Sequence, residues 1–249
     1  MNVPVVRRAA QAVADFVNAA PLPKRAAVGY DSRIGSRLFA EEAACVFAAN
    51  GIETYLYPRL EPVPTLSFAV RQLSCAVGVC ITASHNPAQY NGFKVYGPDG
   101  CQLTPEGVAK IAENLKNRSY FDAIQTGVFS SLLKAGKIQW ISDSVLDSFL
   151  HAVLSLRTTR EDLFDLSLVY TPLNGSGREL ADQLFAKLGV RNCTLVEEQS
   201  QPDGTFPTCP YPNPEIPEAM ALGLSYCKRL HPDLLAGTDP DCDPCGVAA

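Results

Sequence analysis

Residues 76–87, Ala-Val-Gly-Val-Cys-Ile-Thr-Ala-Ser-His-Asn-Pro, join an apolar run of strand length to a polar loop. Similar apolar or alternating runs predict further strands at 26–30, 52–57 and 93–96. Helical spacing of apolar residues, or a helix-start signal, predicts helices at 6–18, at 39–49 and from Thr104-Pro105 onward. Strands that alternate with helices in this way are typical of a three-layer α/β domain.

The rest of the chain repeats this alternation and predicts a second α/β domain. Two of its expected helices cover 143–156 and 177–188, and a third ends near 228. Its expected strands lie at 166–170, 193–196 and 234–237. The weakly patterned stretch 119–137 is the expected linker, which gives domains at 1–130 and 138–249. The fold class is therefore two consecutive three-layer α/β/α domains. The second is expected to be incomplete at its C-terminus, because 246–249 stops in the middle of a strand.

Composition excludes several classes of protein. The 249 residues carry a net charge of −5, which is not the basic balance of a nucleic-acid-binding protein. We find no signal-peptide core and no apolar run of about 18 residues, so the prediction is a cytoplasmic protein with neither a membrane nor a nucleic-acid partner. The nine cysteines, an odd number, favour buried thiols in a reducing compartment over a disulfide framework. Oligomeric state is left open.

The loop after the strand at 76–81 is the first candidate site. Ligands of open α/β sheets bind beyond the carboxyl ends of the strands, which is where Ser84 is presented. Ser84 could be a nucleophile, a phosphate carrier or part of a polar turn. A Ser-His general-base pair is not expected, because Ser84 and His85 are neighbours whose side chains diverge on an extended loop. The Gly-x-Ser-x-Gly elbow of α/β-hydrolases is also absent.

The second candidate site is an acidic loop that follows the strand at 234–237. Asp239, Asp241 and Asp243 alternate along the chain, so their side chains project to one side of an extended loop. Three unpaired carboxylates repel one another, and a bound Mg²⁺ would hold them together. An EF-hand is excluded because Pro244 replaces its central glycine. An exposed acidic turn and an aspartate-nucleophile phosphatase remain alternatives.

Two further segments follow predicted strands. Residues 170–177 join a strand to a helix through two glycines, a backbone suited to binding an anion at a helix N-terminus. Arg33 follows the strand at 26–30, where it could bind phosphate or pair with Asp31.

Five motifs stand in one order along the chain: Ile-Thr-Ala-Ser-His-Asn-Pro at 81–87, Asn-Gly-Phe-Lys at 91–94, Thr-Pro-Leu-Asn-Gly at 171–175, Asp-Gly-Thr-Phe-Pro at 203–207 and Asp-Pro-Asp-Cys-Asp at 239–243. In this order the chain resembles the α-D-phosphohexomutases of the phosphoglucomutase/phosphomannomutase branch. The resemblance implies an isomerase that interconverts hexose 1-phosphate and 6-phosphate. It does so through a phosphoserine and a hexose bisphosphate, and its partner is a small-molecule sugar phosphate.

The resemblance also implies a role for each matching residue. Ser84 would carry the phosphoryl group, and His85 and Lys94 would assist proton transfer. One Mg²⁺ per chain would be bound by Ser84, Asp239, Asp241 and Asp243. The residues expected to contact substrate or phosphate are Arg33, Asn86 and Asn174.

The chain departs from the family pattern in three ways. It matches only the first two of four domains, and it lacks the early Gly-Thr-x-Gly-x-Arg-Gly segment. Pro244 stands where the family usually has an arginine. We therefore expect a phosphohexomutase fragment that is inactive as a mutase by itself. The alternatives are a serine- or aspartate-dependent phosphatase-like activity and a non-catalytic fragment. Sugar preference is not decided by these motifs.

Overall fold

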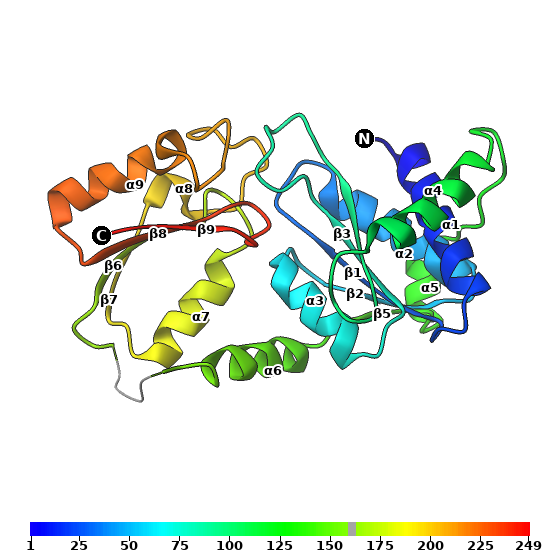
Figure 1. Ribbon diagram of the computed structural model, residues 1–249, viewed down its shortest axis with the longest axis horizontal. Helices are drawn as coiled ribbons and strands as arrows, with labels where there is room; N and C mark the ends of the chain where they lie inside the picture. The colour runs from blue at the N-terminus through cyan, green and yellow to red at the C-terminus, as the bar shows by residue number, and fades with distance from the viewer. Residues whose placement is uncertain (159–162) are drawn as a thin grey trace. The chain divides into compact units, whose positions relative to one another are not determined.

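The computed structural model describes residues 1–158 and 163–249 (Figure 1). The chain forms two compact units. The first contains residues 1–30, 35–82 and 91–145, and the second contains 31–34, 83–90 and 146–249. Two short segments that follow strands of the first unit, 31–34 and 83–90, therefore belong to the second unit. These segments carry Arg33 and Ser84.

The first unit is built on a five-stranded sheet with the order β4-β3-β1-β2-β5. Only β4 runs antiparallel to its neighbour, and the other pairings are parallel. The strands are β1 (Arg25–Tyr30), β2 (Glu53–Leu56), β3 (Val77–Ile81), β4 (Phe93–Tyr96) and β5 (Ile138–Trp140). In the central pair, Tyr30 of β1 lies opposite Ile81 of β3. The segments that follow these two strands therefore leave the same edge of the sheet.

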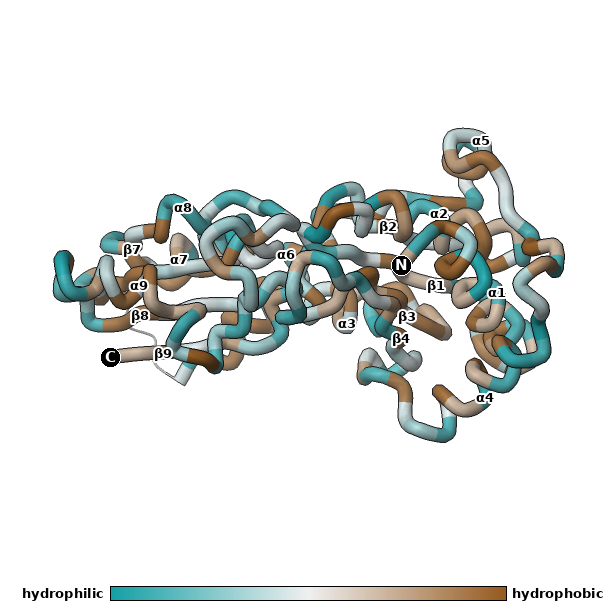
Figure 2. The backbone as a smooth tube through the Cα atoms, turned by 90° about the horizontal axis from the view of Figure 1, so that it is seen from above, coloured by the Kyte–Doolittle hydropathy of each residue, from teal (hydrophilic) through white to brown (hydrophobic). Residues whose placement is uncertain are grey.

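Helices cover this sheet. Their bounds are α1 (Val3–Ala19), α2 (Ser36–Ala49), α3 (Val63–Gln72), α4 (Pro105–Lys116) and α5 (Phe129–Lys134). The helix α2 packs on β1 and on α1, α3 contacts β1 and β3, and α4 packs on α1. Figure 2 shows hydrophobic and hydrophilic residues mixed along α1, and buried apolar residues recur every three or four positions at Val6, Ala10, Val13 and Val17. This amphipathic pattern explains why one face of the helix is buried.

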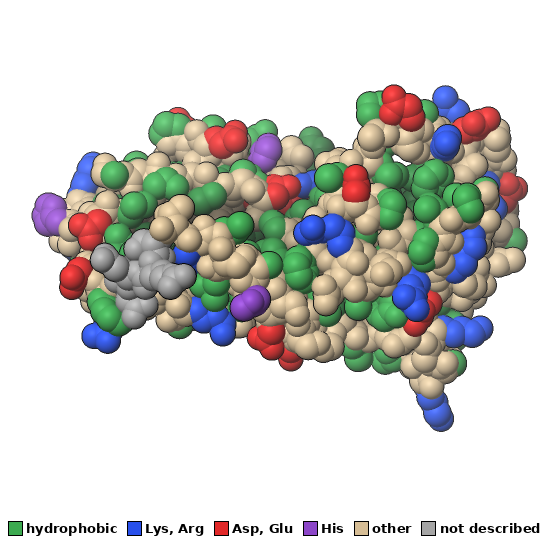
Figure 3. Space-filling view, turned by 60° about the horizontal axis from the view of Figure 1, so that its bottom comes forward, with side chains coloured by type: hydrophobic (Ala, Val, Ile, Leu, Met, Phe, Trp, Pro, Cys, Tyr) green, Lys and Arg blue, Asp and Glu red, His purple; other side chains and the backbone are tan. Residues whose placement is uncertain are grey.

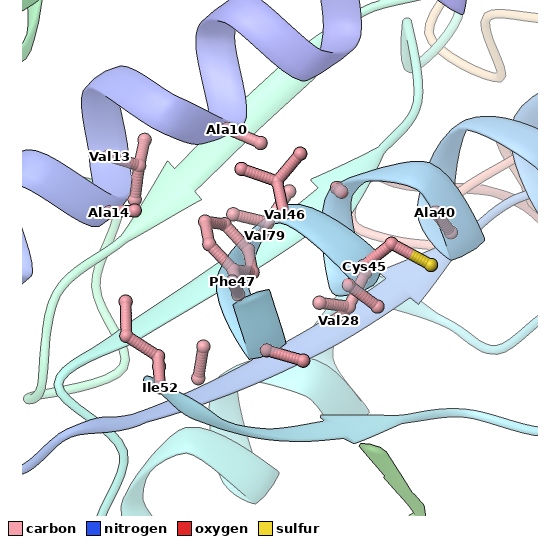
Figure 4. Close-up of a cluster of buried hydrophobic side chains, with 14 of the residues drawn as sticks. Ala10, Val13, Ala14, Val28, Ala40, Cys45, Val46, Phe47, Ile52 and Val79 are labelled. Carbon is pink, nitrogen blue, oxygen red and sulfur yellow. The ribbon is translucent and has the colours of Figure 1, made fainter. Parts of the chain in front are cut away.

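The core of the first unit lies between α1, α2 and the sheet. Figure 4 shows Phe47 and Val46 of α2 among small side chains such as Ala10, and both large residues are fully buried. Alanines on the facing helices let α1 and α2 approach closely, while Phe47 fills the remaining space. This packing stabilises the sheet whose strand ends lead into the candidate site.

The second unit contains a four-stranded sheet with the order β7-β6-β8-β9. The pairings β6–β7 and β6–β8 are parallel, and β9 is antiparallel to β8. The strands are β6 (Ser167–Thr171), β7 (Asn192–Leu195), β8 (Leu234–Thr238) and β9 (Cys245–Ala248), and the helices are α7 (Arg178–Leu188), α8 (Glu197–Ser200) and α9 (Pro217–Leu230). The helix α6 (Asp143–Leu154) begins in the last residues of the first unit and continues into the second. The acidic segment connects β8 to β9 as a hairpin loop.

The predicted α/β fold is confirmed, with differences in detail. The expected linker 119–137 contains α5. The strand that follows this segment, β5, pairs with β2 and so belongs to the first sheet. The helices α3 and α8 were not predicted. The start of α3 has no side-chain cap that would mark it in the sequence, and α8 spans only four residues. The strand at the end of the chain, β9, is paired with β8 along its length. The domain limits 1–130 and 138–249 stay a prediction.

Two other expectations concern the surface and the thiols. Among the described residues no helix is long and apolar enough to cross a membrane. On the face drawn in Figure 3, charged side chains of both signs are interspersed. All nine cysteines are free. Cys45, Cys75, Cys80 and Cys209 are buried as expected, whereas Cys101 and Cys245 are exposed.

Candidate functional site

Ser84 lies in the polar loop after β3, and its backbone is held in the left-handed region with φ of +53°. A residue with a Cβ atom adopts this conformation at a cost in free energy, and such residues are concentrated at functional sites. The Ser84 hydroxyl donates a hydrogen bond of 2.9 Å to Oδ2 of Asp239. Both residues belong to the second unit. The predicted serine and the predicted acidic loop thus meet in one site.

The acidic loop brings three carboxylates together. One oxygen from each of Asp239, Asp241 and Asp243 lies within 4.8 Å of the other two. Asp239 and Asp241 are fully buried, and Asp243 is exposed. The loop is closed by a hydrogen bond of 3.0 Å from the Cys242 amide to the Asp239 carbonyl. A second bond, of 3.2 Å, runs from the Asp243 amide to Oδ1 of Asp239.

The electrostatics of this loop are unfavourable for three bare carboxylates. Burial raises the pKa of Asp239 well above its ordinary range, and the neighbouring Asp241 and Asp243 raise it further. The hydrogen bond from Ser84 acts in the opposite direction. A divalent cation would offset this repulsion, and an all-oxygen donor set of carboxylates and one hydroxyl is the kind that hard cations prefer. The residues present therefore fit a divalent cation.

The glycine-containing segment after β6 supports the acidic loop. The amide and the hydroxyl of Ser176 both donate to the Pro240 carbonyl, each at 2.9 Å. A Cβ atom on Gly175 would lie 2.4 Å from Cα of Pro240, so only glycine allows this approach. A Cβ atom on Gly177 would lie 3.0 Å from Sγ of Cys242. The glycines at 175 and 177 thus permit close packing against the loop that carries the carboxylates.

Asn174, expected to contact substrate, is almost completely buried in the second unit. Its side-chain amide donates to the carbonyls of Gln201 at 2.8 Å and of Glu198 at 3.3 Å. Its backbone is left-handed, with φ of +58°. These contacts tie the segment after β6 to the loop that begins at 201. A contact between Asn174 and substrate phosphate stays a prediction.

Arg33 is also buried, and its side chain is fully enclosed. It forms an ion pair of 3.1 Å with Asp31 and donates hydrogen bonds to backbone carbonyls of the Ser84 loop. Burial lowers the pKa of the Arg33 guanidinium, while the charges of Asp31, Asp241 and Asp239 raise it. These partners lie inside the protein, so phosphate binding by Arg33 stays a prediction.

The other predicted residues are more accessible. The ring of His85 lies 6.3 Å from that of Tyr211, and in the described part of the chain its Nδ1 atom has no hydrogen-bond partner. Asn86 is exposed and donates to the Ala83 carbonyl at 2.9 Å. Lys94 lies in the first unit, on β4, where it lines a cavity of about 440 Å³. Apolar side chains of α1 and α4 form most of that cavity.

Several residues around the site were not predicted from the sequence. Gly204 and Phe206 contact the Arg33 segment, a role that their motif does not signal by itself. Tyr211 faces His85, and no spacing in the Pro-rich loop signals that contact. Cys242 and Cys245 stand in Cys-x-x-Cys spacing beside the acidic loop, so the expectation that the nine cysteines include no such pair was wrong. Burial raises the pKa of the Cys242 thiol to about 12 and also raises the pKa of the Cys245 thiol.

Comparisons with known proteins identify the family of the chain. Residues 1–121 match the family description "Phosphoglucomutase/phosphomannomutase, alpha/beta/alpha domain I", and residues 146–249 match "alpha/beta/alpha domain II" of the same family. A phosphoglucomutase of Staphylococcus saprophyticus is 35% identical over 246 residues, which is 99% of this chain and 44% of that protein. A protein of Haemophilus influenzae named probable phosphomannomutase is 33% identical over 251 residues, 100% of this chain and 50% of that protein.

Solved structures show the same fold. A phosphoglucomutase/phosphomannomutase family protein from Burkholderia thailandensis superposes with a TM-score of 0.80 at 21% identity, covering 100% of this chain and 51% of the other. A structure from Thermus thermophilus superposes with a TM-score of 0.84 at 23% identity, covering 100% and 53%. Fold and site together define an α/β protein with a serine beside a carboxylate cluster. The chain belongs to the phosphoglucomutase/phosphomannomutase family, and it spans about half the length of the curated relatives it matches.

Proposed function

We propose that this chain carries the phosphoserine and cation sites of a phosphohexomutase, in which phosphorylated Ser84 gives its phosphoryl group to a hexose monophosphate. The hexose bisphosphate formed then returns its other phosphoryl group to Ser84. The observation that carries the proposal is the 2.9 Å hydrogen bond from the Ser84 hydroxyl to Asp239 within the carboxylate cluster. Phosphoryl transfer depends on positioning and on neutralisation of charge more than on covalent assistance. A serine fixed beside a cation site supplies both requirements.

Mg²⁺ is the cation we propose, one per chain. Asp239, Asp241 and Asp243 would hold it, and the oxygen on Ser84 would complete the protein ligands. When bound, the ion supplies positive charge that stabilises the transferring phosphoryl group. The chain's own contribution is the rigid hairpin loop, supported by Ser176 through Pro240, that holds the three carboxylates together.

Proton transfer at the sugar hydroxyl would fall to His85 or Lys94. Support for His85 is its place next to Ser84 and a ring nitrogen that has no hydrogen-bond partner among the described residues. Support for Lys94 is its half-buried position on β4 and its match to the family motif. Asn86 is exposed beside Ser84, so its side chain is available to a substrate phosphate. The substrate we propose is a hexose monophosphate, with a hexose bisphosphate as the intermediate that phosphorylates Ser84.

We further propose that residues 1–249 alone accept phosphate but turn over little hexose phosphate. The mutase reaction must grip a sugar phosphate in two orientations, and the curated relatives are about twice as long as this chain. Nine free cysteines suit a reducing compartment, and we place the protein in the cytoplasm. A phosphatase with an aspartate nucleophile stays an alternative, because Asp243 of the carboxylate cluster is exposed. If the chain slowly hydrolysed phosphorylated Ser84, the phosphatase-like activity would be supported.

The test is to incubate the chain with a hexose 1,6-bisphosphate and Mg²⁺ and to measure the intact mass. We expect the addition of one phosphoryl group to the wild-type chain, located on Ser84 by peptide mapping. Ser84→Ala should remain unmodified, and Ser131→Ala, which alters an exposed serine of α5, should behave as the wild type. Modification of Ser84→Ala to the wild-type extent, or no modification of the wild type, would contradict the proposal.

A further inference from the structure

We infer that Arg33 is a positioning residue, which holds the Ser84 loop in its strained conformation through hydrogen bonds to the loop's backbone. The inference concerns the architecture of the proposed phosphoserine site, and it rests on the proposed function only where phosphorylation is measured. The sequence predicted that Arg33 contacts substrate, whereas the inference assigns its guanidinium to backbone carbonyls of the Ser84 loop.

Arg33 contacts the Ser84 loop at four backbone carbonyls. Its Nη2 atom donates to the carbonyls of Ser84 and Asn86, and its Nη1 atom donates to those of Pro87 at 3.0 Å and Tyr90 at 3.1 Å. A guanidinium is a rigid, planar group with five donors, so it can satisfy several diverging carbonyls at once. The first of these bonds is made to the residue whose backbone is left-handed. One side chain therefore fixes both ends of the loop.

Arg33 is itself fixed from the opposite side. Its Nε atom lies 3.1 Å from Oδ2 of Asp31, and its backbone amide donates to Oδ1 of the same carboxylate at 3.0 Å. The side chains of both residues are fully enclosed, so solvent does not weaken this pair as it would on the surface. The charge of the guanidinium is thereby matched, and its hydrogen-bonding edge faces the carbonyls.

The loop at 203–206 closes over the same arginine. The guanidinium carbon lies 5.0 Å from the centre of the Phe206 ring, a cation–π contact. A Cβ atom on Gly204 would lie 2.5 Å from the amide nitrogen of Ile34 and 2.7 Å from Cα of Arg33. Only glycine allows this approach. Gly204 and Phe206 of the Asp-Gly-Thr-Phe-Pro motif, to which the proposed function assigns no role, therefore pack against the Arg33 segment.

Enclosure separates this role from substrate binding. The Arg33 side chain has no exposed surface, so a phosphate could reach it only after the Ser84 loop had moved. The left-handed backbone at Ser84 costs free energy that surrounding contacts must offset. The hydrogen bonds from Arg33 to the loop carbonyls, which include the Ser84 carbonyl, can offset this cost. Loss of the contacts should release the loop while leaving the two sheets intact.

The experiment compares three forms of the full chain: the wild type, Arg33→Lys and the control variant Arg118→Lys. Lysine keeps the positive charge but cannot bond four carbonyls. Arg118 pairs with Asp15 at 2.7 Å in the first unit, so the same change there alters an ion pair that does not touch the Ser84 loop. Amide hydrogen exchange of residues 83–90 is read by mass spectrometry, and Ser84 phosphorylation by a hexose 1,6-bisphosphate is read separately.

We expect Arg33→Lys to speed exchange at 83–90 by about tenfold or more, because exchange there requires local opening of the loop. Phosphorylation of Ser84 should slow by roughly tenfold or more. Arg118→Lys should change neither value. Phe206→Leu, which keeps the carbonyl bonds, should raise exchange in the same segment by a smaller factor.

Unchanged exchange at 83–90 in folded Arg33→Lys would overturn the inference. If Arg33→Lys does not fold, unchanged exchange at 83–90 in Asp31→Asn, which removes the charged partner that fixes the guanidinium, would overturn it instead. If exchange rises as expected but the wild type is never phosphorylated, the positioning role stands and the proposed function fails. The two conclusions are thus tested separately.

Discussion

The hydroxyl of Ser84 donates a hydrogen bond of 2.9 Å to Oδ2 of Asp239, although 155 positions separate the two residues in the chain. The contact joins the polar loop after β3 to the hairpin loop between β8 and β9 within the second unit. It places the proposed phosphoryl carrier against the residue that begins the carboxylate cluster. A change at either residue should therefore be felt at the other.

Replacement of Asp239 should weaken cation binding strongly. Asp239→Asn removes one charged ligand from a cluster whose oxygen atoms lie within 4.8 Å of one another. We expect the dissociation constant for Mn²⁺, measured by calorimetry, to rise by roughly tenfold or more. Asp147→Asn, which alters an exposed carboxylate on α6, should leave the constant unchanged. Equal effects of the two variants would show that the cluster is not the binding site.

Stability without a divalent cation should fall as pH rises. Burial and the neighbouring carboxylates raise the pKa of Asp239 in the folded state above the value of about 3.9 in the unfolded chain. The folded state then binds the extra proton, so this contribution is fully present below the unfolded pKa and is lost as pH rises through the folded pKa. The melting temperature measured in EDTA should therefore fall as the pH is raised from about 5.

Mg²⁺ should flatten that decline, because the cation replaces the proton as the partner of the carboxylates. Asp239→Asn supplies the control, since it removes the titrating group, and its melting temperature in EDTA should depend less on pH. A wild-type profile that matches the Asp239→Asn profile would show that Asp239 does not titrate in this range.

Gly175→Ala should disturb the acidic loop through its backbone. The added Cβ atom would lie 2.4 Å from Cα of Pro240 and 2.7 Å from its carbonyl oxygen, and backbone atoms cannot yield as a flexible side chain can. We expect a loss of about 1–3 kcal/mol in the free energy of unfolding, measured in urea, together with weaker Mn²⁺ binding. In the control, Gly107→Ala on α4, the new atom meets only Leu103 at 3.4 Å. That variant should be neutral or slightly stabilised.

Mutase turnover by the 249-residue chain should be slight. The proposed reaction needs groups that hold the distal phosphate, and the chain spans 44% of one relative and 50% of another. A coupled assay of glucose 1-phosphate conversion to glucose 6-phosphate measures this directly, with Ser84→Ala as the control. Serine-dependent turnover close to that of a full-length relative would contradict the prediction.

Local patterns were enough to predict most of the fold. Apolar runs located β1, β3 and β4, and the cap at Thr104 located the start of α4, because these signals depend on residues close in sequence. The strand β5 escaped because it spans only three residues, and its pairing with β2 is fixed by packing at long range. Such a pairing leaves no periodic signal.

The candidate site also has one part that local sequence predicted and one part that depends on contacts between distant residues. The alternation of Asp239, Asp241 and Asp243 indicated clustered carboxylates, and the structure brings their oxygen atoms together. The burial of Arg33 was not predictable, because it depends on carbonyls more than fifty positions away and on the loop that carries Phe206. A charged residue after a strand looks the same in sequence whether it faces a ligand or the protein's own backbone.

The most direct measurement is an anomalous diffraction map of crystals of the full chain grown with Mn²⁺. The account predicts one strong peak coordinated by Asp239, Asp241 and Asp243, with the side-chain oxygen of Ser84 among the nearest protein atoms. Absence of a peak at the three carboxylates in crystals that bind Mn²⁺ elsewhere, or a peak there with Ser84 turned away from it, would contradict the account.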